Sequence, residues 1–241
     1  FVCCLSSVNL LHYDAWKDTD LVETMIGFLD AVMSDFCEKL ETMRDSGVPE
    51  KKLAFTFMER AYNFAKANRA LGLGVLGYHS YLQAKQLPFE SPDAEELNVA
   101  MFKNIHTKAL AASTALAKTL GEPEVLKGYG RRNTTLLAIA PTTSSAFILG
   151  QVSQSIEPVW SNCYVKDVAK LKVTIKNPFL EALLEEKGKN TKDVWSNIRD
   201  NDGSVQHLDF LSDDEKKVFR TFAEIGQAVV IKQAATRQDY I

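Results

Sequence analysis

The first third of the chain is dominated by apolar residues spaced three and four positions apart. From about residue 18 to residue 44 this spacing predicts one long amphipathic helix, and Gly47 and Pro49 end the pattern. A second helix is predicted over about 54–68. Its expected apolar stripe is Phe57, Ala61, Phe64 and Ala65.

Further helices are predicted downstream. Ser91 is a good N-cap, Pro92 suits the first helical position, and Gly121 is the expected terminator of a helix that ends at Leu120. A break in this helix near Asn104 or Thr107 stays open. The remaining predicted helices are about 178–187, about 191–199, one opened by a capping box at Ser212 to Glu215, and one from about Phe222 to the end.

Three short apolar segments have the character of strands. They are the opening FVCCLSSVNLL, the glycine stretch LGLGVLG at 71–77, and NTTLLAIA at 133–140. A few strands among many helices predict a helix-rich α/β fold. Because no repeat, low-complexity tract or linker interrupts the chain, residues 1–241 are treated as one segment without an internal boundary.

The glycine stretch contains GLGVLG, which matches the G-x-G-x-x-G spacing of a dinucleotide-binding loop. That fingerprint needs a strand before the glycines, and the segment before them is predicted to be helical. The glycines are then better explained as part of a strand that another backbone or a ligand approaches closely. A nicotinamide-dinucleotide-binding oxidoreductase remains the alternative.

Composition limits the class of protein. The 241 residues are 46% hydrophobic and 24% charged, with a net charge of -3, which suits a globular protein and disfavours a nucleic-acid partner. The apolar runs are too short or too charged to cross a membrane, so a cytoplasmic setting is expected. The chain opens on Phe1 and stops inside a helical pattern, and we expect both ends to lie within a longer protein.

The turn Pro141-Thr142-Thr143-Ser144-Ser145 is the strongest candidate site on physical grounds. It follows a predicted strand and leads into a short predicted helix, whose first N–H groups lack partners and favour an anion. Four hydroxyls add hydrogen-bond donors. The alternative is that Thr142 or Thr143 only caps the helix.

Cysteines and histidines provide weaker candidates. Cys3 and Cys4 would point to opposite faces of a strand, so only one of them can face a cavity. The four cysteines lack zinc spacing, and the histidines have no H-x-x-x-H pair, so no metal site is indicated. His79 is expected to be a satisfied, partly buried histidine. Glu157 is expected to orient Arg131 or Arg132.

Taken together, these segments resemble the large (alpha) subunit of class I ribonucleotide reductase over essentially the whole chain. The resemblance rests on four motifs in the family's order: CCLSSVNL at 3–10, RALGLGV at 69–75, RNTTLLAIAPTTSS at 132–145, and SIEP at 155–158. It implies that the chain is the later half of a ten-stranded α/β barrel with its surrounding helices. It also implies that the glycine stretch is a barrel strand and that residues 141–145 hold a substrate diphosphate.

The same resemblance implies radical reduction of ribonucleoside diphosphates to deoxyribonucleoside diphosphates for DNA synthesis. Cys3 would be one thiol of the redox pair that reduces the substrate, and Cys4 a neighbour packed away from the cavity. Implied partners are a radical-generating, metal-containing small (beta) subunit, thioredoxin or glutaredoxin, and a second large subunit. No cofactor is expected on this segment, because ATP and other effectors bind elsewhere in the family.

Several parts of the family pattern are expected outside this chain. They are the loop with the radical cysteine, the first cysteine of the redox pair, the effector regions, the radical-relay tyrosines and the C-terminal cysteine tail. We therefore expect the isolated chain to be inactive. A non-catalytic helical interaction module, in which residues 141–145 only cap a helix, is the second alternative.

Overall fold

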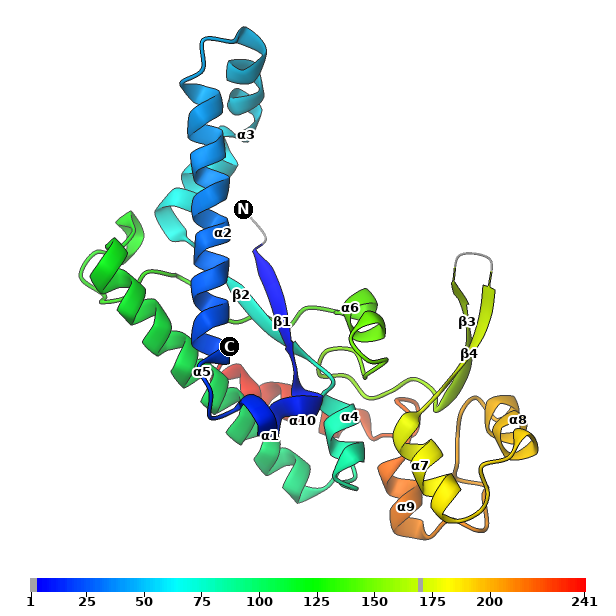
Figure 1. Cartoon of the computed structure of the whole chain (residues 1–241). Coiled ribbons are helices and arrows are strands. Elements are labelled where there is room, and N and C mark those ends of the chain that lie inside the picture. The colour runs from blue at the N-terminus through cyan, green and yellow to red at the C-terminus, as the bar shows by residue number, and fades with distance from the viewer. Residues whose placement is uncertain (1–3, 169–170) are drawn as a thin grey trace.

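The computed structural model describes residues 4–168 and 171–241 (Figure 1). The strands are β1 (Leu5–Asn9), β2 (Gly72–Leu76), β3 (Cys163–Val168) and β4 (Leu171–Lys176). The α-helices are α1 (Tyr13–Trp16), α2 (Leu21–Arg44), α3 (Pro49–Asn68), α4 (Tyr78–Ala84), α5 (Pro92–Leu120), α6 (Thr143–Ile148), α7 (Pro178–Glu186), α8 (Lys192–Asp200), α9 (Asp213–Val218) and α10 (Gln227–Gln238). Short 3-10 helices cover Leu10–His12 and Glu124–Leu126.

Most of the predicted helices are confirmed with their end signals, but the last one begins at Gln227 rather than near Phe222. The Ser91 hydroxyl accepts a hydrogen bond from the Ala94 N–H, α5 runs unbroken to Leu120, and Gly121 follows with a positive φ of 83°. Asn177 and Thr191 cap α7 and α8, and the Ser212–Glu215 capping box opens α9. These signals are local, so the sequence alone locates them well.

The second predicted helix begins earlier than expected and buries a different face. Helix α3 starts at Pro49, which serves as its first residue, rather than near residue 54. Phe57, expected in the apolar stripe, is 79% exposed, whereas Phe55, Tyr62 and Ala65 are buried. The reason is that Phe55 and Tyr62 turn toward α2, where the Tyr62 hydroxyl donates to a Glu41 carboxylate oxygen at 2.5 Å.

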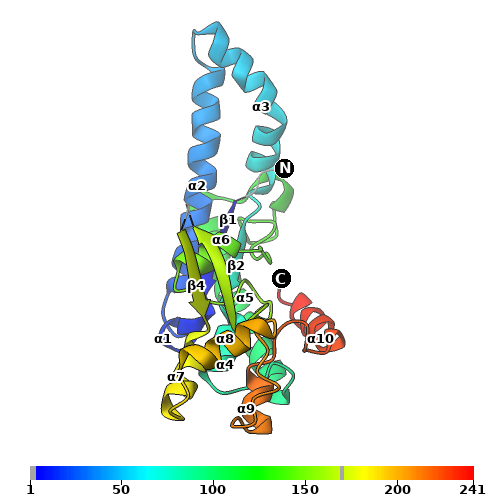
Figure 2. The ribbon, with the colours of Figure 1, turned by 90° about the vertical axis from the view of Figure 1, so that its right-hand side faces the viewer.

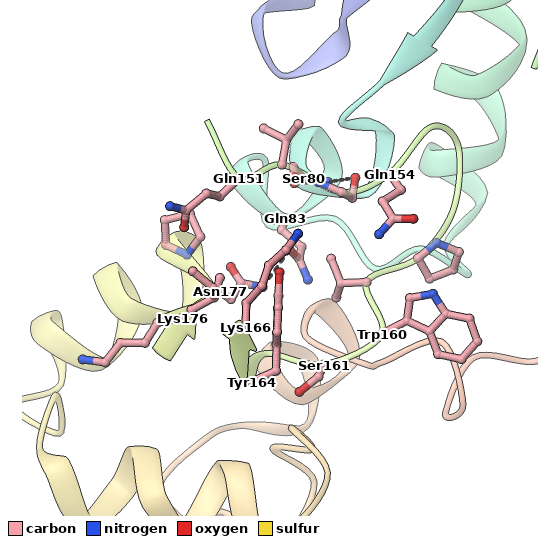
Figure 3. Close-up of a pocket in the computed structure, with 16 residues that line it drawn as sticks. Ser80, Gln83, Gln151, Gln154, Trp160, Ser161, Tyr164, Lys166, Lys176 and Asn177 are labelled. Carbon is pink, nitrogen blue, oxygen red and sulfur yellow. Dashed lines mark hydrogen bonds between the residues drawn. The ribbon is translucent and has the colours of Figure 1, made fainter. Parts of the chain in front are cut away.

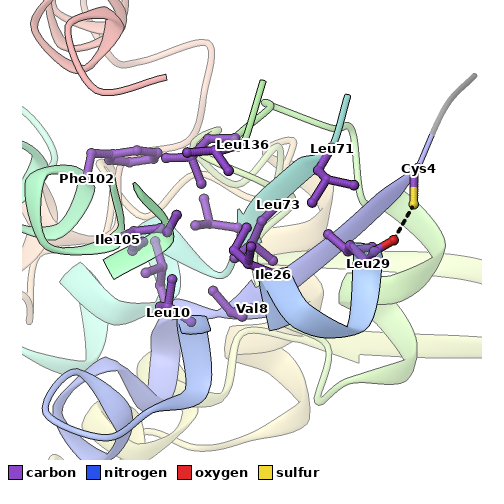
Figure 4. Close-up of a cluster of buried hydrophobic side chains, with 14 of the residues drawn as sticks. Cys4, Val8, Leu10, Ile26, Leu29, Leu71, Leu73, Phe102, Ile105 and Leu136 are labelled. Atoms are coloured by element: carbon purple, nitrogen blue, oxygen red, sulfur yellow. Dashed lines mark hydrogen bonds between the residues drawn. The ribbon is translucent and has the colours of Figure 1, made fainter. Parts of the chain in front are cut away.

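Strands β1 and β2 are parallel and adjacent, with Val8 opposite Val75 in the register. Side chains from β1, β2, α2 and α5 meet in the main core, as Val8, Leu73, Ile26 and Ile105 show (Figure 4). Figure 1 shows α6 beyond β1, on the opposite side from α2. The parallel strands thus have helices on both sides.

The predicted strand over 133–140 is largely wrong. Only Leu137 forms a bridge, to Leu73, although the N–H groups of Leu71 and Leu73 still donate to the Thr135 and Leu136 carbonyls. The beginning of the segment bonds to helices instead: the Asn133 N–H donates to the Ser113 hydroxyl. The extended segment therefore lies beside β2 without forming a regular ladder.

The glycines of β2 permit this close approach. A Cβ on Gly74 would lie 2.7 Å from the Ala138 carbonyl oxygen, and a Cβ on Gly72 would lie 2.9 Å from the Ala138 Cβ. All five residues of β2 are buried, and a helix, α3, precedes them. The dinucleotide-binding interpretation of GLGVLG is therefore wrong, because Gly72 and Gly74 pack against other segments of the protein.

The antiparallel hairpin of β3 and β4 was not anticipated, and it leads into a second hydrophobic cluster. Cys163, Leu180, Trp195, Ile198 and Phe219 are buried in this cluster, which α7, α8 and α9 surround. Figure 2 shows the hairpin in front of α6 and above α7 and α8. No helix in the described ranges is long and apolar enough to cross a membrane.

Replacing Gly74 with Ala is expected to destabilise the protein by roughly 1–3 kcal/mol, because the new Cβ meets a backbone oxygen that cannot rotate away. Gly27→Ala in α2 is the matched control. It meets nothing within 4 Å and should stabilise the protein by up to about 1 kcal/mol through helix propensity. Urea denaturation of both variants tests the pair, and equal effects would contradict the close packing of β2.

Candidate functional site

The turn 141–145 lies at the start of α6, with three of its four hydroxyl residues in the first helical turn. Thr142 is the N-cap residue and adopts the left-handed conformation, with φ 53°. Pro141, Thr143, Ser144 and Ser145 are exposed, and Thr142 is half-buried. A β-branched residue with positive φ is strained, so the neighbouring contacts must hold it there.

Loop 150–155 supplies those contacts. The Ser155 N–H donates to the Thr142 hydroxyl oxygen at 2.8 Å, and the Thr143 hydroxyl donates to the Gln154 side-chain oxygen at 3.1 Å. Neither threonine side chain caps α6, so the capping interpretation fails for both. Among the residues that the structure describes, none accepts or donates a hydrogen bond with the hydroxyls of Ser144 and Ser145.

The other end of α6 is tied to β1. The Asn9 side-chain amide donates to the Leu149 carbonyl at 3.3 Å, and the Asn9 side-chain oxygen accepts from the Leu11 N–H. Ser80 and Ser153 exchange two hydrogen bonds between their hydroxyls and N–H groups, which ties loop 150–155 to α4. The turn 141–145 is thus held beside the β1–β2 strands from both ends of α6.

Cys3, the predicted redox thiol, lies outside the described residues. Its neighbour Cys4 is 8% exposed and its thiol points to the Leu29 carbonyl of α2 at 3.5 Å (Figure 4). Cys4 therefore packs in the main core, the position that the family resemblance implied for it.

A buried carboxylate joins the chain segments that lead into β2 and into the turn. Asp30 of α2, 1% exposed, accepts from Arg69 at 2.8 Å, from Arg132 at 2.9 Å and from the Asn133 amide at 2.9 Å. Burial alone would raise the pKa of Asp30, but the hydrogen bonds from Arg69 and Arg132 outweigh it and the pKa is lowered.

This cluster corrects one expectation. Arg132 pairs with Asp30 rather than with Glu157, and Arg131 donates to the Thr134 carbonyl at 2.8 Å. No ion pair between Glu157 and either arginine forms within residues 4–168 and 171–241. The sequence does contain a signal for the partner of Arg132, because Asp30 is a charged residue in line with the apolar positions of a predicted helix.

His79 is more deeply buried than expected. It is fully buried in α4, its Nδ1 accepts from the Val159 N–H at 3.0 Å, and its ring meets the Phe89 ring edge-on at 5.2 Å. Burial lowers the pKa of His79 to about 3, so the ring stays neutral at physiological pH. His79 is therefore a structural residue of the core and has no access to the turn.

A cavity of about 460 Å³ lies between loop 151–154, α4 and the β3–β4 hairpin (Figure 3). Its floor carries the Gln83–Asn177 hydrogen bond of 2.9 Å, and Lys166 lies over the Phe147 ring at 4.0 Å. No residue of 141–145 lines it. The alternation of apolar and polar residues in LKVTIK predicts a strand there, but the cavity itself forms only where distant segments meet.

The described residues contain no group of three or more His, Cys, Asp or Glu side chains placed to hold a metal ion. The donors of the candidate site are neutral: they are the hydroxyls of Ser144 and Ser145 and the N–H groups at the start of α6. Such a group suits an anion.

The comparisons with known proteins identify the family. The model of the family "Ribonucleotide reductase, barrel domain" matches residues 1–125 and 122–241. The chain belongs to this ribonucleotide reductase family. The match confirms the family inferred from the four sequence motifs and the helix-rich α/β fold class.

Relatives in the family are large subunits of the reductase. The putative ribonucleoside-diphosphate reductase large subunit of Frog virus 3 is 42% identical over the whole chain, which covers 40% of that protein. The large subunit of Invertebrate iridescent virus 6 is also 42% identical, with 24% of its length covered. The solved alpha subunit of the class Id ribonucleotide reductase of Actinobacillus ureae matches with 55% identity and a TM-score of 0.88, over 42% of its length.

Removing the Asp30 carboxylate is expected to be severe. Asp30→Ala leaves the buried Arg69 and the half-buried Arg132 without their anion, and a loss of about 3–5 kcal/mol in the free energy of unfolding is expected. Asp35→Ala, one turn further along α2, removes an exposed pair with Lys39 and should change stability by no more than about 0.5 kcal/mol. Chemical denaturation measures both, and a mild effect of Asp30→Ala would refute the central role of the cluster.

The neutral His79 ring should make stability depend on pH. Its pKa is about 6.5 in the unfolded chain and about 3 in the fold, so stability is full above pH 6.5 and falls as the pH is lowered toward 3. Between pH 6.5 and 5 the loss should be about 2 kcal/mol. The variant His79→Leu has no imidazole to titrate, so this part of the pH dependence of the free energy of unfolding should disappear, whatever the stability of the variant at pH 7. Denaturation series at several pH values test this, and parallel slopes would count against it.

Proposed function

We propose that this chain forms part of the catalytic barrel of a ribonucleoside-diphosphate reductase and that residues 141–145 hold the substrate diphosphate. The proposal rests on the unpaired hydrogen-bond donors of this turn. Ser144 and Ser145 are exposed, and their hydroxyls make no hydrogen bond to another described residue, while Thr142 and Thr143 fix the backbone around them. Hydrogen-bond donors that are fixed in position and have no acceptor among the described residues suit an anionic ligand.

The second element of the proposal is the thiol of Cys3. Ser7 and Asn9 have the same odd–even parity as Cys3 along the chain, and Asn9 bonds to the end of α6. By contrast, Cys4 faces α2. We assign Cys3, rather than Cys4, as one thiol of a pair that becomes a disulfide when the 2′ hydroxyl of the ribose leaves as water. The two thiols supply the two electrons that the ribose gains.

The partners belong to the proposal as well. The other thiol of the pair, the radical cysteine and the effector sites would lie on the remaining length of the large subunit. A small subunit would generate the radical, and thioredoxin or glutaredoxin would reduce the disulfide. The chain covers 40% and 42% of two of its relatives, so it would act only within such an assembly, in the cytoplasm.

The diphosphate assignment is tested in a full-length large subunit that contains this segment. Ser144→Ala with Ser145→Ala should weaken binding of a ribonucleoside diphosphate by at least about 100-fold, since two hydrogen bonds to a charged group are lost and each is worth about 1.5–3 kcal/mol. Binding of the same nucleoside without phosphates should not change. Thr119→Ala, which removes an exposed hydroxyl near the end of α5, is the control. Unchanged diphosphate affinity would reject the site.

The thiol assignment has its own test. Cys3→Ser in the full-length subunit should abolish turnover with thioredoxin or glutaredoxin while substrate affinity stays within about twofold, because the thiol supplies electrons rather than binding energy. Cys4→Ala should keep turnover and lose stability, since it leaves a cavity beside Leu29. The reverse pattern would assign the redox role to Cys4.

A further inference from the structure

Helix α4 begins without a side-chain cap from its own N-terminal residue. Its N-cap residue is Gly77, which has a φ of 81° and no side chain to accept from the first N–H groups of the helix. These groups need partners, because Tyr78 and Ser80 are both buried. The partners come from loop 150–155, and the one that serves Ser80 lies 73 positions further along the chain.

Hydrogen bonds join the start of α4 to this loop. The Gly77 N–H donates to the Ser153 carbonyl at 2.8 Å, and the Tyr78 N–H donates to the Ser155 carbonyl at 3.3 Å. The Ser80 N–H donates to the Ser153 hydroxyl oxygen at 3.1 Å, and the Ser153 N–H donates to the Ser80 hydroxyl oxygen at 2.8 Å (Figure 3). The Ser153 hydroxyl thus caps α4 in place of the side chain that Gly77 lacks.

The Ser80–Ser153 pair lies inside this chain. The two residues are 3% and 4% exposed, and α4 follows one residue after β2, whose residues are all buried. The hydrogen bonds of the pair therefore do not depend on what covers the surface of this chain in a complete large subunit. A loop that is bonded to this base at Ser153 and at Ser155 leaves little freedom to Gln154 between them.

The loop residues fixed in this way are the ones that bind the turn 141–145. The Thr143 hydroxyl donates to the Gln154 side-chain oxygen at 3.1 Å, and the Ser155 N–H donates to the Thr142 hydroxyl oxygen at 2.8 Å. Thr142 has a φ of 53°, a conformation that a β-branched residue leaves when its neighbours no longer hold it. The backbone at the start of α6 thus depends on the loop, and the loop depends on α4.

We propose that Ser80 and Ser153 are positioning residues for the substrate diphosphate. They act through loop 150–155, which keeps Thr142 in the left-handed conformation and so orients the N–H groups at the start of α6. The proposal rests on the assignment of the diphosphate to residues 141–145. Releasing the loop removes none of the donors of that site, but it lowers the fraction of molecules in which the turn is ready to bind.

Ser153→Ala in the full-length large subunit tests the proposal. If the released turn is ready in only about one molecule in ten, the affinity for a ribonucleoside diphosphate falls about tenfold. Binding of the same nucleoside without phosphates should stay within about twofold. Because bound substrate selects the ready conformation, KM should rise about tenfold while kcat stays within about twofold. Ser80→Ala should have the same effect, and the double variant should be little worse than either single variant.

A change at the strained residue separates positioning from a general loss of structure. Glycine adopts positive φ about as readily as negative φ, so a turn with Thr142→Gly is ready in about half of the molecules even when the loop is released. In the Thr142→Gly background, Ser153→Ala should therefore weaken diphosphate binding by only about twofold. A merely structural role of Ser153 would give the same loss of affinity in both backgrounds.

Ser161→Ala is the matched control. The Ser161 hydroxyl also bonds to backbone groups, the N–H and the carbonyl of Cys163, but it lies outside loop 150–155. This variant should lose stability in urea denaturation and keep its diphosphate affinity within about twofold.

Ser144→Ala with Ser145→Ala is measured in parallel, so that the two proposals can fail separately. Unchanged diphosphate affinity in that double variant rejects the site and the positioning role together. If the double variant loses affinity while Ser80→Ala and Ser153→Ala bind like the wild type, only the positioning role is overturned. Equal losses with and without Thr142→Gly overturn it as well.

Discussion

The position of the candidate site depends on the buried carboxylate of Asp30. Arg69 ends α3 in a left-handed conformation, immediately before β2, and Arg132 precedes the extended segment that leads to the turn. By accepting from both arginines, Asp30 fixes the starting points of two chain segments at one place. Beyond these starting points, the N–H groups of Leu71 and Leu73 donate hydrogen bonds to the carbonyls of Thr135 and Leu136.

This common origin also explains the glycines. Once both segments start at Asp30, Ala138 lies so close to β2 that its carbonyl oxygen excludes a side chain at Gly74, and its Cβ helps to exclude one at Gly72. Glycine at every second residue of a buried strand and glycine in a phosphate-binding loop give the same sequence spacing for different physical reasons. The helix before β2 separated the two interpretations correctly, because the secondary structure that precedes the glycines is encoded locally.

The same distinction between local and distant signals explains what could be predicted. Caps such as Ser91 and Ser212 act within four residues, and the helices they begin were found. Asp30 pairs with partners 39 and 102 positions away, so its role could not be seen in the periodicity of α2. The segment 133–140 has strand-like composition, but Ser113 diverts its first hydrogen bonds. The hairpin of β3 and β4 was within reach, since LKVTIK alternates clearly. At the candidate site, the sequence locates the turn 141–145. The hydrogen bonds by which loop 150–155 fixes that turn are tertiary contacts and could not be predicted.

The strain at Thr142 connects the fold to the proposed chemistry. A threonine with φ 53° costs roughly 1–3 kcal/mol relative to an ordinary backbone conformation. The hydrogen bonds from Ser155 to Thr142 and from Thr143 to Gln154 offset this cost before any ligand arrives. The N–H groups at the start of α6 are therefore already oriented, and a bound anion would not have to order the turn. Binding energy saved in this way remains available for holding the ribose in position for reduction.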